Sequence, residues 1–405
     1  MNIIVQKFGG TSVSTKERRK LAIDKILKTY DEGNKVVVVV SAMGRKGEPY
    51  ATDSLRGLIT DSNPKCNLKH LDLLMSCGET ISSVVLSSEL EELGYKSLPL
   101  TGFQAGITTN SNFSDARIIS IDQSKIMNYL NENYIVIVTG FQGITESGEV
   151  TTLGRGGSDT TATALGAALG AKCVEIYTDV DGIMTADPNV VPKAKIIEEI
   201  NYEEIFQMAE KGAKVIHPRA VEIAQYGNIP LKIKNTLSDH PGTTIHSHYK
   251  QLYSVSELRT TLLTAITHKD NIVQVTVYTE GKSDKESSLL SRLTECDISI
   301  DMINFFIDKK VFTIESKDLE ALENILNDLT LNYIYLDGCS KVTIIGSRIT
   351  GIPGVMATIV KALGSENIQI FQSSDSHLTI SCLVAKEHAK KAVNILHKAF
   401  SLDDN

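Results

Sequence analysis

Short runs of apolar, mostly β-branched residues recur along the first 240 residues and alternate with stretches of helical periodicity. Such runs, flanked by glycine or charge, predict buried strands, and the stretches between them predict helices. The first repeat consists of IIVQ at 3–6, a helix from about 15 to 30, and VVVVV at 36–40, which together predict a β-α-β unit. The same pattern predicts further strands at 134–140, 173–179 and 230–236.

Polar or glycine-rich turns follow the predicted strands. KFGG follows the first strand and SAMG the second, while GFQG and TDVDG follow two later ones. Parallel strands that are buried on both faces have continuous Val and Ile runs, and ligands bind beyond their carboxyl ends. We therefore predict an α/β region with a mostly parallel central sheet, and we place the candidate active site at the edge where the four turns meet.

The composition changes to that of a linker near SDHPGTTI, residues 238–245, and two shorter β-rich units follow. Each predicts a β-α-β-β order with a further helix, so the C-terminal region is a weak internal duplication of ferredoxin-like α+β units. Units of this kind more often regulate or oligomerise than catalyse. The predicted strands lie at 271–279, 298–306, 310–314, 341–347, 367–374 and 378–384, and the clearest helices lie near 287–295, 318–328 and 355–364.

The segment TTLGRGGSDTTATALGAALG, residues 151–170, predicts a helix with a polar start. Small residues from 160 to 169 are typical of a buried helix, and Gly170 predicts its end. Ser158 or Asp159 is the predicted N-cap. The free N–H groups of a helix start favour phosphate or carboxylate, and adjacent glycines let a ligand approach the backbone. The segment therefore predicts an anion site.

Other interpretations of this segment are weaker. Two adjacent glycines alone would fit a tight turn before a buried helix equally well, and it is Arg155 and Asp159 beside them that favour an anion site. The segment lacks the GxGxxG pattern and the GK[ST] of a P-loop. The chain also has no HRD or DFG segment. These patterns argue against a nicotinamide dehydrogenase, a P-loop nucleotidase and a protein-kinase fold.

Length and charge narrow the class of protein further. A chain of 405 residues is long enough for two or three domains. A net charge of −8 with scattered lysines differs from the clustered basic face of nucleic-acid-binding proteins. The longest apolar run, 36–40, is far shorter than the roughly 20 residues that span a bilayer, and MNIIVQKFGG is too short for a secretory signal. We expect small-molecule chemistry in the cytoplasm, with neither nucleic acid nor membrane as a partner.

The six cysteines are widely spaced, without a CxxC pair or a histidine at metal-ligand spacing. We interpret them as reduced core thiols, and we predict no metal site made by the protein alone. They are Cys66, Cys77, Cys173, Cys296, Cys339 and Cys382.

Seven motifs follow one another in an order typical of a single enzyme family. They are VQKFGGTSV, VVSAMG, SCGETISS, GFQG, TTLGRGGSDTTA, IYTDVDGIMTADP and AKVIHPRAVEIA. Together they resemble the aspartokinases of the amino-acid kinase superfamily, and the two C-terminal units resemble that family's tandem ACT domains. The resemblance implies a three-layer amino-acid kinase domain at 1–245 and ACT-like domains at 246–335 and 336–405. AMGRKGEPYATDSL and QSSDSH are most similar to the diaminopimelate-responsive subgroup.

The resemblance implies a reaction. The γ-phosphoryl group of ATP passes to the side-chain carboxylate of L-aspartate, which gives 4-phospho-L-aspartate on the route to lysine, threonine, methionine and diaminopimelate. Such a transfer depends on alignment and on neutralisation of negative charge more than on covalent help from the protein. Mg²⁺ is expected chiefly on the ATP, because it prefers phosphate oxygens and water to a protein cage.

The resemblance also assigns roles to residues. Lys7 contacts the transferring phosphate and Asp159 orients Lys7. Arg155 holds the α-carboxylate of the substrate with two parallel hydrogen bonds, and Glu79 takes its ammonium group. Without the resemblance, Glu79 would be interpreted as a solvated helix residue. Further substrate candidates are Ser41, Thr52 and Ser158, and the nucleotide candidates are Lys7, Phe8, Gly9, Gly10, Thr178, Asp179, Asp187, Lys214 and Lys234.

Two segments depart from the family pattern. RKGEPY separates SAMG from ATDSL, which affects the alignment of Thr52. TEGKSDKES replaces the glycine-proline turn in the first ACT-like unit, whereas TGIPGV at 350–355 matches the ACT effector loop in the second.

For regulation, the resemblance implies a homodimer that binds its effector between ACT units of different subunits. Such a dimer would bring IDMINF near FQSSDS. The expected effector is diaminopimelate or lysine, with or without threonine. The predicted effector-binding residues are Asp301, Ile303, Asn304, Gln372 and Ser373.

Two alternatives to an aspartokinase remain open at this stage. One is another amino-acid kinase, such as one that acts on glutamate, which would not explain CGET, GRGGSD and the ACT-like pair together. The other is an amino-acid sensor with an inactive kinase domain, which the intact Lys7, Arg155 and Asp159 oppose.

Overall fold

The computed structural model describes residues 2–213, 215–247, 263–279, 283–347, 349 and 352–403. The chain divides into two compact units, which we describe separately. Unit 1 comprises residues 1–183, 196–209 and 214–250, and unit 2 comprises residues 184–195, 210–213 and 251–405. Two short segments inside the kinase-like sequence therefore belong to unit 2. The domain limits at 245 and 335 remain a prediction.

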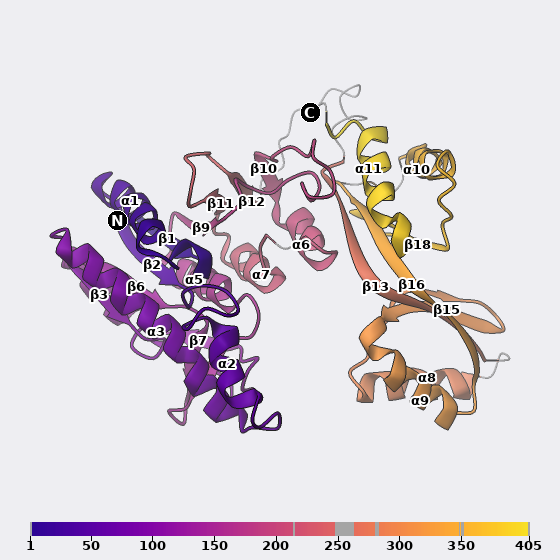
Figure 1. Ribbon diagram of the computed structural model, residues 1–405, viewed down its shortest axis with the longest axis horizontal. Helices are drawn as coiled ribbons and strands as arrows, with labels where there is room; N and C mark the ends of the chain where they lie inside the picture. Colours follow the sequence, from indigo (N-terminus) through magenta and orange to yellow (C-terminus); the bar gives the residue numbers. More distant parts are fainter. Residues whose placement is uncertain are drawn as a thin grey trace. The chain divides into compact units, whose positions relative to one another are not determined.

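The core of unit 1 is an eight-stranded sheet in the order β10-β12-β11-β9-β1-β2-β6-β3 (Figure 1). Every neighbouring pair is parallel except β11 and β12. The predicted mostly parallel α/β sheet is therefore confirmed. The strands are β1 (Ile3–Phe8), β2 (Lys35–Val40), β3 (Ser97–Leu100), β6 (Ile135–Thr139), β9 (Cys173–Thr178), β10 (Glu199–Asn201), β11 (Leu231–Asn235) and β12 (Thr243–His246).

Helices cover both faces of this sheet, which gives unit 1 three layers. α1 (Lys16–Asp31) and α3 (Leu68–Glu92) share a buried core with Val36, Val38 and Val40 of β2. α5 (Gly157–Leu169) packs against β1 on the opposite face, and α7 packs against α5. The three-layer architecture expected from the resemblance is therefore present. The other helices are α2 (Thr52–Thr60), α4 (Ser124–Asn131), α6 (Tyr202–Glu210) and α7 (Pro218–Gly227).

A smaller sheet of four strands, in the order β5-β4-β7-β8, completes unit 1. Its last strand leads directly into the segment before α5, which carries Arg155. The strands are β4 (Ile107–Thr109), β5 (Ile118–Ile121), β7 (Gln142–Thr145) and β8 (Val150–Thr152).

The described residues of unit 2 form a six-stranded antiparallel sheet in the order β14-β15-β13-β16-β18-β17, with four α-helices packed on it. Two separate hydrophobic clusters fill it, one around Val275 and Leu326 and one around Val342 and Leu396. The duplicated α+β pattern is thus present. The elements are β13 (Ala265–Tyr278), α8 (Ser283–Glu295), β14 (Asp301–Phe305), β15 (Lys309–Glu315), α9 (Leu319–Asp328), β16 (Asn332–Ile345), α10 (Val355–Gly364), β17 (Gln372–Asp375), β18 (Thr379–Ala385) and α11 (Ala389–Ala399).

The two central strands of unit 2 are longer than the sequence predicts. β13 and β16 pair along most of their lengths and run through both halves of the sheet. The prediction began the second of them too late, at 341 instead of 332, because Asp337 and Gly338 have the sequence of a turn. In the structure Gly338 takes a positive φ of 66° beside a shift in strand register, so the pair forms an irregularity within a continuous strand.

The cysteine prediction is partly wrong. All six cysteines are free, and Cys173, Cys339 and Cys382 are buried. Cys77, in α3, and Cys296, in the turn directly after α8, are however exposed.

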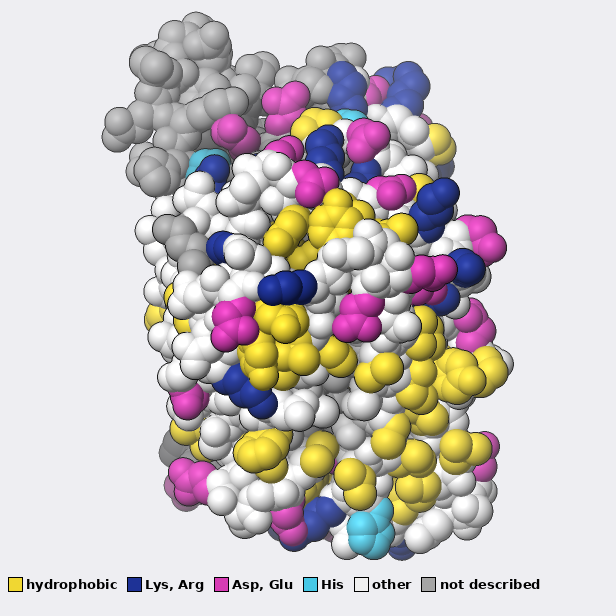
Figure 2. Space-filling model, turned by 90° about the vertical axis from the view of Figure 1, so that its left-hand side faces the viewer, with side chains coloured by type: hydrophobic (Ala, Val, Ile, Leu, Met, Phe, Trp, Pro, Cys, Tyr) yellow, Lys and Arg dark blue, Asp and Glu magenta, His cyan; other side chains and the backbone are white. Residues whose placement is uncertain are grey.

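The surface of the described residues agrees with the composition. On the face shown in Figure 2, Lys and Arg side chains are interspersed with Asp and Glu and do not form one basic patch. No helix within the described residues is long and apolar enough to cross a membrane.

Candidate active site at the carboxyl edge of the unit 1 sheet

Four strands that are neighbours in the sheet bring their turns to one edge. β9, β1, β2 and β6 are parallel and adjacent, so their carboxyl ends lie side by side. Backbone hydrogen bonds join these ends: Ser41 N–H donates to Phe8 O at 3.1 Å, and Gly140 N–H donates to Val40 O at 2.9 Å. The predicted convergence of KFGG, SAMG, GFQG and TDVDG is confirmed.

Gly10 allows two of these turns to touch. A Cβ atom at this position would lie 2.5 Å from Ala42 O and 2.8 Å from Gly44 O. Gly44 N–H also donates to Gly10 O at 3.0 Å. A larger residue at position 10 would push the KFGG turn away from the SAMG turn, so glycine is required by this close approach.

Lys7 and Asp159 form an ion pair at this edge. Strand alternation points Lys7 toward α5, on the face opposite Gln6 and Phe8. Its Nζ lies 2.7 Å from Asp159 Oδ1, and both side chains are mostly buried. The structure therefore brings together the two residues predicted to be catalytic.

The predicted N-cap of α5 is wrong. The helix begins at Gly157, and the cap position is Gly156 in the left-handed conformation, with φ of 67° and no side-chain capping bond. Ser158 and Asp159 lie inside the first turn, where their side chains are free to point at the sheet edge. The helix thus starts one residue before Ser158, after a backbone turn in which Gly157 N–H donates to Gly154 O at 3.1 Å.

Ser158 lies close to the end of β6. A Cβ atom on Gly140 would be 2.7 Å from Ser158 Oγ and 2.9 Å from Val40 O. The hydroxyl of Ser158 is therefore beside the turn that follows β2, where Ser41 begins the SAMG turn.

Arg155 lies in the segment 153–157, which joins β8 to α5. Its side chain is exposed and makes no ion pair with any described residue. Gly154 and Gly156 on either side have positive φ angles of 72° and 67°. Arg155 is thus held through the backbone of this segment, with its guanidinium available to a ligand.

Glu79 is buried in α3, contrary to its interpretation from local sequence as a solvated residue. Its side chain is 2 % exposed, and Oε1 accepts a hydrogen bond of 3.0 Å from the Ala42 backbone N–H. Oε2 has no hydrogen-bond partner among the described residues. Burial raises the pKa of the Glu79 carboxyl to about 8, although the bond from Ala42 acts in the opposite direction. Helix periodicity alone did not reveal this burial.

Thr52 lies at the start of α2, close to the helix that carries Glu79. A Cβ atom on Gly78 would lie 2.8 Å from the Ala42 Cβ, 3.0 Å from Tyr50 O and 3.1 Å from a Leu55 methyl group. The RKGEPY insertion therefore leaves the segment around Thr52 packed against α3.

The nucleotide candidates have different surroundings. The Phe8 side chain is fully buried and stacks on Tyr177, with ring centroids 4.7 Å apart, so only its backbone is at the edge. Thr178 ends β9, and Asp179 pairs with Arg45 at 2.6 Å. Asp187 belongs to unit 2, where its carboxylate accepts a hydrogen bond from Asn189 N–H. Lys214 lies outside the described residues.

Lys234 occupies the sheet face opposite Lys7. It pairs with Glu175 at 3.1 Å and lies over the Tyr177 ring at 5.3 Å. The Lys234 ammonium is the main partner charge that lowers the pKa of the Glu175 carboxyl, against a desolvation effect in the opposite direction. Its contact with phosphate remains a prediction.

Four of the predicted effector residues lie together in unit 2. Gln372 donates to Asn304 Oδ1 at 2.7 Å and to Met302 O, and it accepts from Gln274 at 2.8 Å. The contact joins IDMINF to FQSSDS within one chain, because the edge strands β14 and β17 approach each other. Asp301 pairs with the buried Lys341. Ile303 packs on the cluster around Val275.

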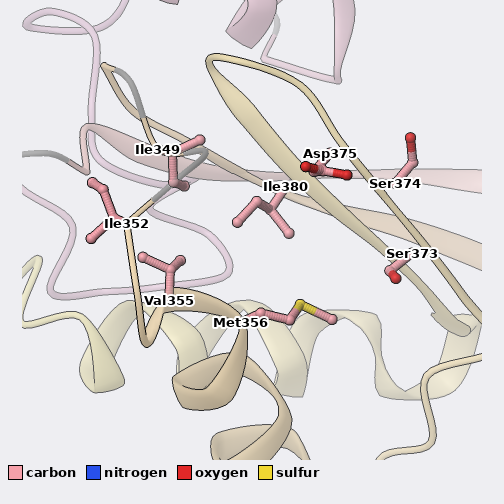
Figure 3. A pocket seen from close by; sticks show the side chains of 8 residues that line it. All are labelled: Ile349, Ile352, Val355, Met356, Ser373, Ser374, Asp375 and Ile380. Atoms are coloured by element: carbon pink, nitrogen blue, oxygen red, sulfur yellow. The ribbon is translucent and has the colours of Figure 1, made fainter.

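Ser373 lines a cavity of about 300 Å³ in unit 2. The cavity lies between the start of α10 and strands β17 and β18, near the predicted effector loop (Figure 3). Residues 350 and 351 of that loop lie outside the described residues, as do 280–282 of the atypical loop in the first unit. The lining residues are Ile349, Ile352, Val355, Met356, Ser373, Ser374, Asp375 and Ile380.

Three side chains near the edge were not singled out from the sequence. Arg45, in the RKGEPY insertion, reaches Asp179. His217 and Arg219, in AKVIHPRAVEIA, contact the segment that carries Arg155. The His-Pro pair was a usable signal, since proline at the first position of a helix marks a defined helix start.

Comparison with known proteins places this geometry in a family. The amino acid kinase family matches residues 2–235, and the ACT domain matches residues 335–398. Aspartokinase 1 of Bacillus subtilis (strain 168) is 45% identical over 99% of this chain and 100% of its own length. The chain belongs to the aspartokinases.

Two solved aspartokinase structures are similar over the whole chain. E. coli aspartokinase III in complex with aspartate and ADP has a TM-score of 0.80 and 25% identity, and it covers 98% of this chain and 99% of its own. The same enzyme in complex with lysine and aspartate has a TM-score of 0.74 at the same identity and coverage. The aspartokinase architecture, with kinase and ACT parts, therefore accounts for both units.

Proposed function

We propose that the carboxyl edge of the unit 1 sheet performs the aspartokinase reaction in this chain. The enzyme transfers the γ-phosphoryl group of ATP to the side-chain carboxylate of L-aspartate, which gives ADP and 4-phospho-L-aspartate. The observation that carries the site assignment is the Lys7–Asp159 pair, which joins the end of β1 to the first turn of α5. A glutamate kinase would not explain the full-length identity to an aspartokinase.

At the phosphoryl end, Lys7 neutralises charge on the transferring group. A side-chain oxygen of aspartate attacks the γ-phosphorus while the bond to the β-phosphate oxygen breaks and ADP leaves. Such a transfer is accelerated by fixed positive charge and by backbone donors more than by proton transfer. Asp159 holds the Lys7 ammonium in place, and the backbone of Gly9 and Gly10 lies beside it.

At the aspartate end, two opposite charges match the substrate. Arg155 has an exposed guanidinium that donates two parallel hydrogen bonds to the α-carboxylate. Glu79 offers Oε2, a buried acceptor without a partner among the described residues, to the ammonium group. The hydroxyls of Ser41, Thr52 and Ser158 surround the same substrate.

For the nucleotide, we propose contacts from Thr178 and Asp179 at the end of β9, with Asp187, Lys214 and Lys234 as further candidates. Mg²⁺ enters with ATP, since it keeps phosphate oxygens and water as ligands. Within the described residues, no group of three or more His, Cys, Asp or Glu side chains is arranged to hold a metal. Asp159 is the carboxylate that pairs with Lys7 at the phosphoryl end.

The ACT part of the chain provides feedback regulation of an amino-acid biosynthetic enzyme. We propose that the effector is diaminopimelate or lysine, and that Asp301, Ile303, Asn304, Gln372 and Ser373 contact it in a homodimer. The complex of E. coli aspartokinase III with lysine supports the lysine alternative. A cytoplasmic location is proposed from the biosynthetic role of the family.

Hydroxylamine trapping of the acyl phosphate tests the substrate and the regulator together. The chain is incubated with ATP, Mg²⁺ and either L-aspartate or L-glutamate, each with and without lysine, threonine or diaminopimelate. We expect aspartyl hydroxamate, suppressed by diaminopimelate or lysine. Hydroxamate from glutamate alone would support the other amino-acid kinase. No hydroxamate from either substrate, with effector binding retained, would support a sensor.

A further inference from the structure

The segment 153–157 carries Arg155, yet its shape is set by contacts from elsewhere in unit 1. The Arg155 side chain makes no ion pair with a described residue, so the direction in which it points depends on the backbone on either side. Gly154 and Gly156 both take left-handed conformations, which other residues rarely adopt. A backbone of this kind needs external support to stay in one arrangement.

Arg219, in the first turn of α7, supplies one such support. Its Nη1 donates to Leu153 O at 2.9 Å and more weakly to Ala116 O at 3.5 Å. Its Nη2 pairs with Asp115 Oδ1 at 2.9 Å. The planar guanidinium thus joins the segment 153–157 to the loop at 114–116, a geometry that a lysine ammonium cannot reproduce.

His217 supports the other end of the segment. It is the N-cap of α7, and its Nδ1 accepts a hydrogen bond of 3.3 Å from the Arg219 N–H. A Cβ atom on Gly156 would lie 2.3 Å from the His217 Cβ, so the imidazole lies directly against this glycine. The start of α7 therefore contacts the segment on both sides of Arg155.

A buried carboxylate holds the residues that come directly before the partners of Arg219 in the chain. Asp72 of α3 is fully buried and accepts hydrogen bonds of 2.8 to 2.9 Å from the backbone and hydroxyl groups of Ser114 and Thr152. These two residues immediately precede the partners of Arg219 in the chain. All four bonds belong to one charge-assisted network, which makes the backbone at Ser114 and Thr152 rigid.

We infer that Arg219 is a positioning residue, which holds the backbone of 153–157 so that Arg155 is presented to the α-carboxylate of the substrate. The inference rests on the role proposed above for Arg155. Arg219 does not touch the substrate, and it acts only through Arg155. Its loss should therefore weaken aspartate binding and leave ATP binding and the phosphoryl end unchanged.

A double-mutant cycle tests this inference. Arg219→Lys, Arg155→Ala and the double variant are compared by calorimetric binding of L-aspartate and by the KM values for aspartate and ATP. We expect Arg219→Lys to weaken aspartate binding about tenfold or more, the range for loss of a charge-assisted hydrogen bond. The KM for ATP should stay within about twofold. In the Arg155→Ala background, Arg219→Lys should have no further effect on aspartate binding.

Arg19→Lys is the matched control. Its guanidinium likewise joins a carboxylate, Glu89 at 2.7 Å, to a backbone carbonyl, Val13 O at 3.2 Å, and it meets no residue of 153–157. Both lysine variants should lower the melting temperature, but only Arg219→Lys should selectively weaken aspartate binding. If Arg219→Lys does not fold, Asp115→Asn removes the charged partner of Arg219 and should weaken aspartate binding in the same direction.

The outcomes separate the two claims. Unchanged aspartate binding in Arg155→Ala would refute the role of Arg155. Weakened binding in Arg155→Ala, with an equal further loss on adding Arg219→Lys, would refute only the positioning role of Arg219. If Arg219→Lys raises the KM values for aspartate and ATP by similar factors, Arg219 has only a general structural role. This result also overturns the inference.

Discussion

Glu79 Oε1 accepts a 3.0 Å hydrogen bond from the Ala42 backbone N–H, which ties the middle of α3 to the turn after β2. The bond fixes the direction of a buried carboxylate whose second oxygen has no partner among the described residues. Because burial raises the pKa of Glu79 to about 8, the free enzyme holds this group mainly protonated at neutral pH. Binding of an ammonium group would therefore release a proton from the protein.

Aspartate affinity should increase as the pH rises toward about 8. Only the ionised Glu79 pairs with the substrate ammonium. Below its pKa, Glu79 must first lose a proton, and the free-energy cost of that step weakens aspartate binding. Glu79→Gln should weaken aspartate binding and abolish this part of the pH dependence. Calorimetric titration at pH 6.5 and 8.5 measures both effects. Glu89→Gln, on the same helix, should leave aspartate binding unchanged; a pH profile identical in wild type and Glu79→Gln would rule out the proposed role.

Glu79 should also make the stability of unit 1 pH-dependent. Its folded pKa of about 8 lies above the ordinary glutamate value of about 4.5, so the folded state binds the extra proton between these values. This proton stabilises the folded state by an amount on the order of a few kcal/mol. The stabilisation is complete below pH 4.5 and is lost as the pH rises through 8. Chemical denaturation should therefore show that Glu79→Gln gains stability relative to wild type between pH 5 and 9. A constant difference across this range would contradict the assignment.

Arg155→Lys should raise the KM for aspartate about tenfold or more and leave the KM for ATP nearly unchanged. A lysine ammonium cannot donate the two parallel hydrogen bonds that a carboxylate accepts from a guanidinium. Arg292→Lys, an exposed arginine on α8, is the control for the chemical change alone. Steady-state kinetics with each substrate varied in turn will decide, and an unchanged aspartate KM in Arg155→Lys would refute the carboxylate role.

Gly156→Ala should destabilise unit 1 more than Gly170→Ala at the other end of α5. Both glycines have a left-handed φ, 67° and 58°. An alanine in this region costs about 1 to 2 kcal/mol. At Gly156 the new methyl would also lie 2.3 Å from the His217 Cβ, whereas a methyl at Gly170 would meet no non-neighbouring heavy atom within 4 Å. Thermal unfolding of the two variants measures the difference. An equal loss of stability in both would mean that α7 does not pack tightly against the segment 153–157.

The sheet and its functional edge could be predicted from sequence because each depends on local patterns. Continuous Val runs such as 36–40 mark buried parallel strands, and the turns after them converge by topology alone. The Lys7–Asp159 contact then follows from the register of β1 and the start of α5, and the family resemblance identified its members.

Features that depend on distant contacts could not be predicted. The burial of Glu79 comes from the turn after β2, which is not visible in the periodicity of α3. The start of α5 is set by a left-handed glycine packed on His217, so the capping rule selected the wrong residues. The length of β16 was missed because the Asp337-Gly338 pair, typical of a turn, is accommodated within a strand pairing.

The most direct measurement is the initial rate of aspartyl hydroxamate formation by wild type and by Lys7→Ala, each at saturating ATP, Mg²⁺ and L-aspartate. Lys7 neutralises charge that develops during transfer, so we predict a rapid wild-type rate and a loss of about 10² to 10³ in kcat for the variant. Gln6→Asn, on the neighbouring position of β1 but the opposite face, should retain most of the rate. A near-wild-type rate in Lys7→Ala would contradict the placement of phosphoryl transfer at this edge.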